Sequence, residues 1–147
     1  MAKVFEIGIT HYSGNKIIKI DSVDAIAGKG LLSDRFFKEN NHKNSQLTLI
    51  EKENIDAFNT SLKTPIPYIN FRRNIITEGI KLNGLIGKEI YLGEVKIKIH
   101  ELCEPCKHLQ DLTKQENLVK KLLHKGGIRS EILSNGKIFI NDLINYK

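Results

Sequence analysis

Residues 95–106 read VKIKIHELCEPC, and this stretch decides how the rest of the sequence is interpreted. Apolar and polar side chains alternate from Val95 to His100, which is the period of a strand that buries one face. Pro105 has no backbone N–H, so it ends the hydrogen-bonded ladder just before Cys106. The stretch therefore predicts a strand that carries a cysteine to the point where the backbone leaves a sheet.

Similar alternation recurs on both sides of this stretch and predicts a mainly β protein. Further strands are expected at Phe5–Ile9, Lys16–Ile20, Val23–Ala27, Gln46–Ile50, Phe71–Thr77, Ile128–Leu133 and Lys137–Ile140. Gly14-Asn15 and Ser134-Asn135-Gly136 predict hairpin turns between neighbouring strands. Helices are expected at Glu51–Phe58 and Glu116–His124, where apolar residues follow helical spacing. Together these elements favour a small closed or partly open β-barrel with two or three short helices.

The length and composition bound the class of protein. A chain of 147 residues fits one domain, residues 1–147. No apolar run approaches the roughly 20 residues that a membrane span needs, and the first residues lack the pattern of a signal peptide. The two cysteines, Cys103 and Cys106, are too few for a disulfide scaffold. We therefore expect a cytoplasmic protein whose cysteines are reactive thiols or metal ligands.

The net charge of +6 permits nucleic-acid binding. The lysines are scattered, however, and no basic block is interleaved with aromatic residues. This distribution favours a solvated lysine-rich surface over a nucleic-acid footprint. A small anionic ligand that carries a phosphate is equally compatible with the charge.

The sequence C-E-P-C at residues 103–106 leaves three chemistries open. A structural zinc site needs four ligands, and this chain offers His100 and His108 beside one cysteine pair. A thioredoxin-like redox site needs a βαβ context, whereas this pair follows an alternating strand. The third chemistry is a single nucleophilic or metal-ligating thiol. Cys106 suits it, because Lys107 and His108 favour the thiolate, and Cys103 fits the alternative of a buried, inert cysteine better.

Four stretches, spread over roughly residues 20–144, carry a resemblance to the MOSC family, which occurs at the C-terminus of molybdenum-cofactor sulfurases and as short bacterial proteins. Residues 28–35, GKGLLSDR, resemble the family's glycine loop, with Ser33 at a glycine position. Residues 71–75, FRRNI, resemble its arginine-asparagine strand, and residues 103–109, CEPCKHL, resemble the segment of its characteristic cysteine. Residues 126–142 resemble its closing hairpin, with Asn141 at a glycine position.

The resemblance implies a β-barrel, as the alternation does, and it assigns the family cysteine to Cys106. It implies molybdenum cofactor (molybdopterin) as ligand, with Cys106 as a persulfide carrier or as a molybdenum ligand. The corresponding activities are sulfur transfer and reduction of N-hydroxylated compounds. A cysteine desulfurase or a molybdenum-cofactor enzyme would be the partner, and pyridoxal phosphate is not expected on this chain.

The resemblance also implies which residues face the cofactor. Arg72 and Asn74 would do so, because alternate residues of a strand share a face, which leaves Arg73 on the other side. Lys29, Arg35 and Arg129 are cations that could bind the phosphate of the cofactor or lie at the rim of the barrel. The competing hypotheses are a non-catalytic basic barrel that binds nucleic acid or an acidic partner, and a metal site built on both cysteines and a histidine.

Overall fold

The alternating residues Val95–Leu102 form strand β8 of a computed structural model that describes residues 1–146. The side chains of Val95, Ile97 and Ile99 are completely buried, whereas the residues between them are partly exposed. The strand that the period predicts is therefore present, with its apolar face turned into the core.

Strand β8 belongs to an eight-stranded sheet that curls into a partly open barrel. The order is β11 (Ile144–Asn145), β7 (Glu89–Leu92), β8, β9 (Ile128–Ile132), β5 (Leu47–Glu51), β6 (Ile75–Glu78), β1 (Lys3–Ile9) and β2 (Ile18–Ile20). Strands β5 and β6 run parallel, and the other neighbours are antiparallel. The sheet curls until Lys3 of β1 forms an isolated bridge with Leu143, next to β11. The mainly β, barrel-like fold expected from the sequence is confirmed.

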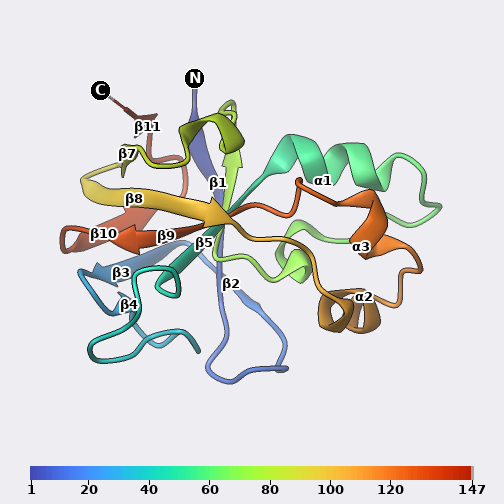
Figure 1. The fold of residues 1–147 in the computed structure, drawn as a ribbon, viewed down its shortest axis with the longest axis horizontal. Helices are drawn as coiled ribbons and strands as arrows, with labels where there is room; N and C mark the ends of the chain where they lie inside the picture. The colour runs from blue at the N-terminus through green and yellow to red at the C-terminus, as the bar shows by residue number, and fades with distance from the viewer. Residues whose placement is uncertain (147) are drawn as a thin grey trace.

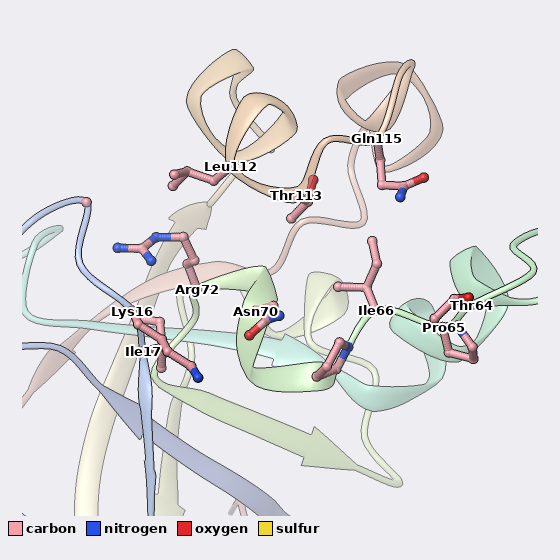
Figure 2. Close-up of a pocket in the computed structure, with 12 residues that line it drawn as sticks. Lys16, Ile17, Thr64, Pro65, Ile66, Asn70, Arg72, Leu112, Thr113 and Gln115 are labelled. Atoms are coloured by element: carbon pink, nitrogen blue, oxygen red, sulfur yellow. The ribbon is translucent and has the colours of Figure 1, made fainter.

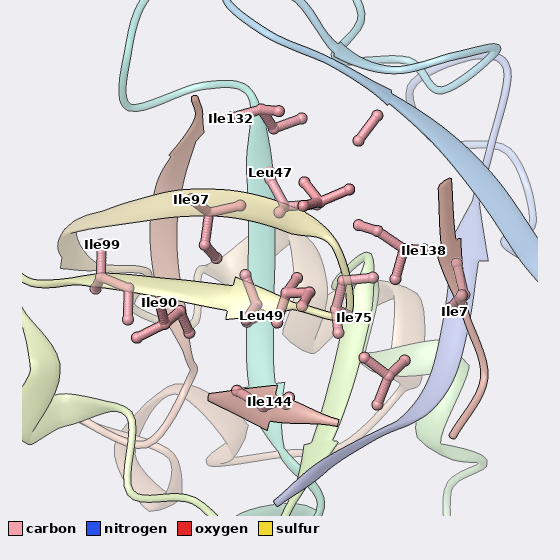
Figure 3. Packing of buried hydrophobic residues seen from close by; sticks show 14 of the residues in the cluster. Ile7, Leu47, Leu49, Ile75, Ile90, Ile97, Ile99, Ile132, Ile138 and Ile144 are labelled. Atoms are coloured by element: carbon pink, nitrogen blue, oxygen red, sulfur yellow. The ribbon is translucent and has the colours of Figure 1, made fainter. Parts of the chain in front are cut away.

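A smaller, three-stranded sheet packs against the barrel. It has the order β10 (Gly136–Phe139), β3 (Ser22–Ile26) and β4 (Gly30–Leu31). Figure 3 shows that the space enclosed by the strands is filled by aliphatic side chains, most of them isoleucine and leucine. A chain with no Trp and only 7% aromatic residues builds its core in this way.

The helices gather on one side of the molecule, beyond the end of β8 (Figure 1). They are α1 (Lys52–Asn59), α2 (Lys107–Thr113), α3 (Leu118–Lys121) and the 3-10 turn η1 (Tyr68–Phe71). A second 3-10 turn, η2 (Asn83–Leu85), lies apart from them beside β7, and its Leu85 packs in the barrel core. A second apolar cluster, which includes Phe58, Phe71, Leu109 and Leu122, packs α1, η1, α2 and the α3 segment together. In residues 1–146, no helix has the length and the hydropathy needed to cross a membrane.

The predicted opening hairpin is confirmed, since β1 and β2 pair antiparallel. The predicted hairpin around Asn135 is wrong. Strand β9 is already flanked by β8 and β5, and β10 pairs with β3 of the other sheet. Asn135 accepts a hydrogen bond from Ala27 N through its Oδ1 (2.7 Å), so it anchors a crossing between sheets.

Two other elements differ from the sequence expectation. The predicted helix Glu116–His124 shrinks to Leu118–Lys121, because Asn117 and His124 adopt left-handed backbone conformations with φ of 64° and 62°. The predicted strand Phe71–Thr77 begins only at Ile75. Phe71 ends a 3-10 turn, and Arg72 follows it with φ 64° and ψ 32°, which breaks the strand alternation.

Asn74 holds the barrel together at the start of β6. It is 1% exposed, and its Oδ1 accepts hydrogen bonds from Thr48 N and Thr48 Oγ1, both at 3.1 Å. Its Nδ2 donates to Gly8 O at 3.2 Å. One amide thus connects β5, β6 and β1, although the resemblance implied that this side chain faces the cofactor.

Leu49→Ala tests the aliphatic core. Leu49 is completely buried in β5, so the truncation should lower the free energy of unfolding by about 2–5 kcal/mol. Leu123→Ala, at a side chain 52% exposed, should lower it by less than about 0.5 kcal/mol. Urea unfolding measures both values, and equal losses would contradict the described burial.

Asn74→Ala tests the structural role of this amide. It removes three hydrogen bonds and leaves buried partners unsatisfied, so the free energy of unfolding should fall by about 2–4 kcal/mol. A residue that only contacted a ligand would show no such loss. Thermal unfolding of the ligand-free variant and of the wild type makes the comparison.

Candidate functional site

A cavity of about 200 Å³ lies at the end of β8, where the chain leaves the barrel towards α2. Its walls contain both cysteines, His108, Glu104 and an unusual concentration of guanidinium groups. These are Arg35, Arg72, Arg73 and Arg129. The arginines come from three separate parts of the chain, around residues 35, 72–73 and 129, so only the fold brings them together.

Cys106 occupies the residue between the extended segment and α2. Its backbone is extended, with φ −119° and ψ 166°, and its Sγ accepts a hydrogen bond from Leu109 N at 3.5 Å. The thiol is exposed, whereas Cys103 is 3% exposed in the wall of the same cavity. The two cysteines therefore differ in access to solvent, as expected from their neighbours in sequence.

Two glycines allow the cysteine segment to lie against the barrel. Cys103 N donates to Gly127 O at 2.8 Å, which continues the β8–β9 ladder beyond its last strand residues. A Cβ on Gly126 would meet Cys103 O at 2.5 Å and Pro105 N at 2.9 Å. Gly127 has φ +103°, a conformation that side-chain-bearing residues rarely adopt. This pair thus permits the close approach of backbone to backbone between the cysteine segment, β5 and the start of β9.

The guanidinium of Arg73 also binds the cysteine segment, residues 103–106, to the barrel. Arg73 is 9% exposed, and its Nε donates to Gly126 O at 2.8 Å, while its Nη2 donates to Cys103 O at 3.2 Å. The sequence interpretation turned Arg73 away from the site, because it assumed a strand through this position. With the backbone bent at Arg72, both arginines line the cavity.

Arg35 brings an incompletely partnered cation into the cavity wall. Its Nη2 donates to Arg72 O at 3.2 Å, but its Nη1 is buried and has no hydrogen-bond partner among the described residues. The nearest carboxylate oxygen, Asp34 Oδ1, is 3.8 Å from Nη1. Burial lowers the pKa of the Arg35 guanidinium, Asp34 opposes this effect, and Arg72 and Arg73 add to it.

Arg72 lies at the outer edge of the cavity, and its Nη1 donates to Asn15 O in the β1–β2 loop at 2.7 Å. Burial also lowers the pKa of the Arg72 guanidinium. Among the residues expected from the sequence, Cys106, Arg35, Arg72 and Arg129 meet in this cavity. Lys29 lies elsewhere and pairs with Glu39 at 2.9 Å, and Asn74 is buried inside the barrel.

A metal site built on both cysteines and a histidine finds no support in the geometry. Within residues 1–146, no three His, Cys, Asp or Glu side chains are grouped so that they could hold a metal ion. The Nε2 of His100 lies 2.8 Å from Glu131 Oε1 on the adjacent strand. What the cavity offers instead is an accessible soft donor, the Cys106 thiol, beside several cations.

Ser33 and Asn141 stand at the two positions where the resemblance expects glycine. Both have positive φ, 71° and 75° respectively, so the left-handed backbone is kept although the glycines are not. Ser33 O lies 2.8 Å from His11 Nδ1, and this contact fixes the loop that leads to Arg35. The loop therefore presents Arg35 to the cavity without the usual glycine.

Comparisons with known proteins agree with this architecture. The YuaD protein from Bacillus subtilis superposes with a TM-score of 0.82 at 17% identity, over 97% of this chain and 93% of that chain. YiiM from Geobacillus stearothermophilus gives a TM-score of 0.81 at 12% identity, over 100% of this chain and 75% of that one. YiiM from Escherichia coli gives 0.70 at 16% identity, over 97% and 70% of the two chains. At such identities these likenesses concern the fold.

A search of curated proteins yields no match to this chain. The family model described as the MOSC domain, in contrast, matches residues 32–145, which include the arginine segment, the cysteine pair and the closing strands. Members of that family are associated in general with molybdenum-cofactor-related function. Because the match covers most of the sequence and the fold agrees with it, the chain belongs to the MOSC domain family.

Proposed function

We propose that this protein acts on molybdenum cofactor, or on sulfur destined for it, through the thiol of Cys106. The observation that carries the proposal is the meeting of one exposed thiol and four arginines in one cavity of about 200 Å³. A nucleic-acid-binding module would spread its cations over an exposed face. Here the guanidinium groups converge beside a sulfur atom, so a small anionic ligand suits the site better.

The residues of the cavity fit a cofactor that carries a phosphate. Arg35 Nη1 is a buried donor with no hydrogen-bond partner in residues 1–146, which costs free energy that a bound anion would recover. Arg72 and Arg129 lie in the same wall and would share the anion. When bound, the cofactor supplies a metal that accepts a soft thiolate ligand and exchanges electrons. Cys106 Sγ would be that ligand, and Arg73 would hold its segment in place.

The same thiol suits the sulfur-carrier role. A Cys106 thiolate attacks the terminal sulfur of a donor persulfide, such as that of a cysteine desulfurase, and forms a new S–S bond. The donor's S–S bond breaks, and its electron pair leaves with the donor thiolate, so the exchange involves no net oxidation or reduction. The cations around Cys106 would stabilise the persulfide anion that results.

The two roles are tested on one set of variants. The protein, incubated with a cysteine desulfurase and cysteine, should gain one sulfur on Cys106 if it is a carrier, as intact mass spectrometry shows. Purified from cells that make molybdenum cofactor, it should retain molybdenum and pterin if Cys106 is a metal ligand.

Cys106→Ala should abolish the sulfur and the retained metal, whereas Cys103→Ala should keep them, because Cys103 is buried. Both variants lose one thiol, so they form a matched pair. If neither sulfur nor cofactor depends on Cys106, the proposal fails. Binding of a nucleic acid that survives in Cys106→Ala would support the basic-module hypothesis instead.

Arg35→Gln tests the anion site independently of the thiol. At equal ionic strength, phosphate at about ten times its dissociation constant should stabilise the wild type by about 1.4 kcal/mol relative to chloride. That corresponds to a rise of about 3–6 °C in Tm for a chain of this size. Arg35→Gln should lose most of this shift, and Lys43→Gln, at an exposed lysine, should keep it. Equal shifts in all three proteins would exclude Arg35 from the anion site.

A further inference from the structure

A second and larger cavity, of about 580 Å³, adjoins the cavity of about 200 Å³ that contains Cys106, which we call the thiol cavity. Arg72 belongs to the walls of both, so the two spaces meet at this side chain. Volumes of this size are typical of sites for small organic molecules. The second cavity extends away from Cys106, and we refer to it as the outer groove.

Three separate segments form the outer groove (Figure 2). The β1–β2 loop contributes Lys16 and Ile17, the chain before and within η1 contributes residues 64–67 and Asn70, and the end of α2 contributes Leu112, Thr113 and Gln115. Much of the wall is apolar. Leu112 is 42% exposed, so its side chain is accessible to a ligand in the groove. The groove thus combines apolar and polar side chains in similar numbers.

The charge of the outer groove is one-sided. Its described lining contains the cations Lys16 and Arg72 and no Asp or Glu. Figure 2 shows Arg72 and Lys16 at one end of the groove, and Thr64, Pro65 and Gln115 at the other. The cationic end is therefore the end that meets the thiol cavity, and the uncharged end lies away from it.

The backbone at Arg72 supports a binding role for this residue. Its φ of 64° lies in the left-handed region, where glycine or asparagine is found most often. Backbone conformations of this kind cluster at sites that bind or react. The hydrogen bond from Arg72 Nη1 to Asn15 O uses one of five guanidinium N–H donors, and other donors remain for both cavities.

We propose that the outer groove binds a small organic anion with an apolar body. A carboxylate at one end of this ligand pairs with Arg72 and Lys16, near Leu112, which Figure 2 shows at the same end of the groove, and the body lies along Ile66 towards Pro65. The ligand thereby presents its charged end to the thiol cavity. The inference that this anion is a substrate of the Cys106 site rests on the proposed function. Binding of the anion to the outer groove does not itself require the thiol.

Three probes separate the parts of the proposal. Phenylbutyrate has a carboxylate and an apolar body, phenylbutyramide lacks the charge, and acetate lacks the body. In amide proton–nitrogen NMR spectra, phenylbutyrate should cause saturable shifts at Ile17, Asn70, Thr113 and Gln115. Phenylbutyramide and acetate should each bind about tenfold or more weakly, because each makes only half of the contacts.

Arg72→Gly is the decisive variant, because glycine adopts this backbone conformation without strain. It should weaken phenylbutyrate binding about tenfold or more and leave phenylbutyramide binding nearly unchanged. Lys43→Gln removes the same charge from an exposed site outside the groove and should change neither. Leu112→Glu, at an exposed position of α2, should also weaken phenylbutyrate, through repulsion of its carboxylate.

Cys106→Ala distinguishes this inference from the proposed function. Phenylbutyrate should bind this variant as it binds the wild type, even though sulfur loading and metal retention are lost. If phenylbutyrate shifts no groove residue, or if Arg72→Gly and Leu112→Glu bind it as well as the wild type does, the groove assignment is wrong. That result would leave the role of Cys106 untouched.

Discussion

The guanidinium of Arg73 is the contact on which the site depends. It lies almost entirely out of solvent and donates to the carbonyls of Gly126 and Cys103, which belong to segments far apart in sequence. Hydrogen bonds from a charged donor to carbonyls in such surroundings are stronger than those between neutral groups. These hydrogen bonds hold residues 103–106 against the barrel where the β8–β9 ladder ends. The position of Cys106, which immediately precedes α2, is fixed as a result.

The cation cluster follows from the same arrangement. Arg35, Arg72 and Arg73 crowd one small volume, and burial lowers the pKa of Arg35 and of Arg72. Concentrating like charges in this way costs stability, which the hydrophobic core must offset. The other basic residues of the chain lie scattered over its surface. The molecule thus places its costly charges at one location, beside its accessible thiol.

Sequence pattern predicted the barrel and the cysteine but missed what tertiary contacts decide. The alternation in Val95–His100 is local, so it identified β8 correctly. The prediction that a strand passes through Arg72 was wrong, because Phe71 is buried among the helices and the backbone turns before β6 begins at Ile75. The prediction of a hairpin between β9 and β10 was wrong, because β10 pairs with β3, which lies more than a hundred residues earlier in the chain.

Helix α2 was missed for a chemical reason. Its first N–H groups are satisfied in part by the sulfur of Cys106, and a thiol is not among the side chains that usually signal the start of a helix. Of the site residues, Cys106 and the arginines Arg35, Arg72 and Arg129 followed from the resemblance. Arg73 did not, because its position depends on the left-handed conformation of its neighbour.

The seam at Lys3 and Leu143 has a consequence for how the molecule assembles. Val4 N donates to Asp142 O, and Ile144 N donates to Ala2 O, so the first strand and the last close the curled sheet against each other, as their positions in Figure 1 suggest. Contacts of such sequence separation carry a large loop-closure entropy and slow the search for the native state. During synthesis, residues 2–4 cannot form the seam until residues 142–144 have emerged, about 140 residues later.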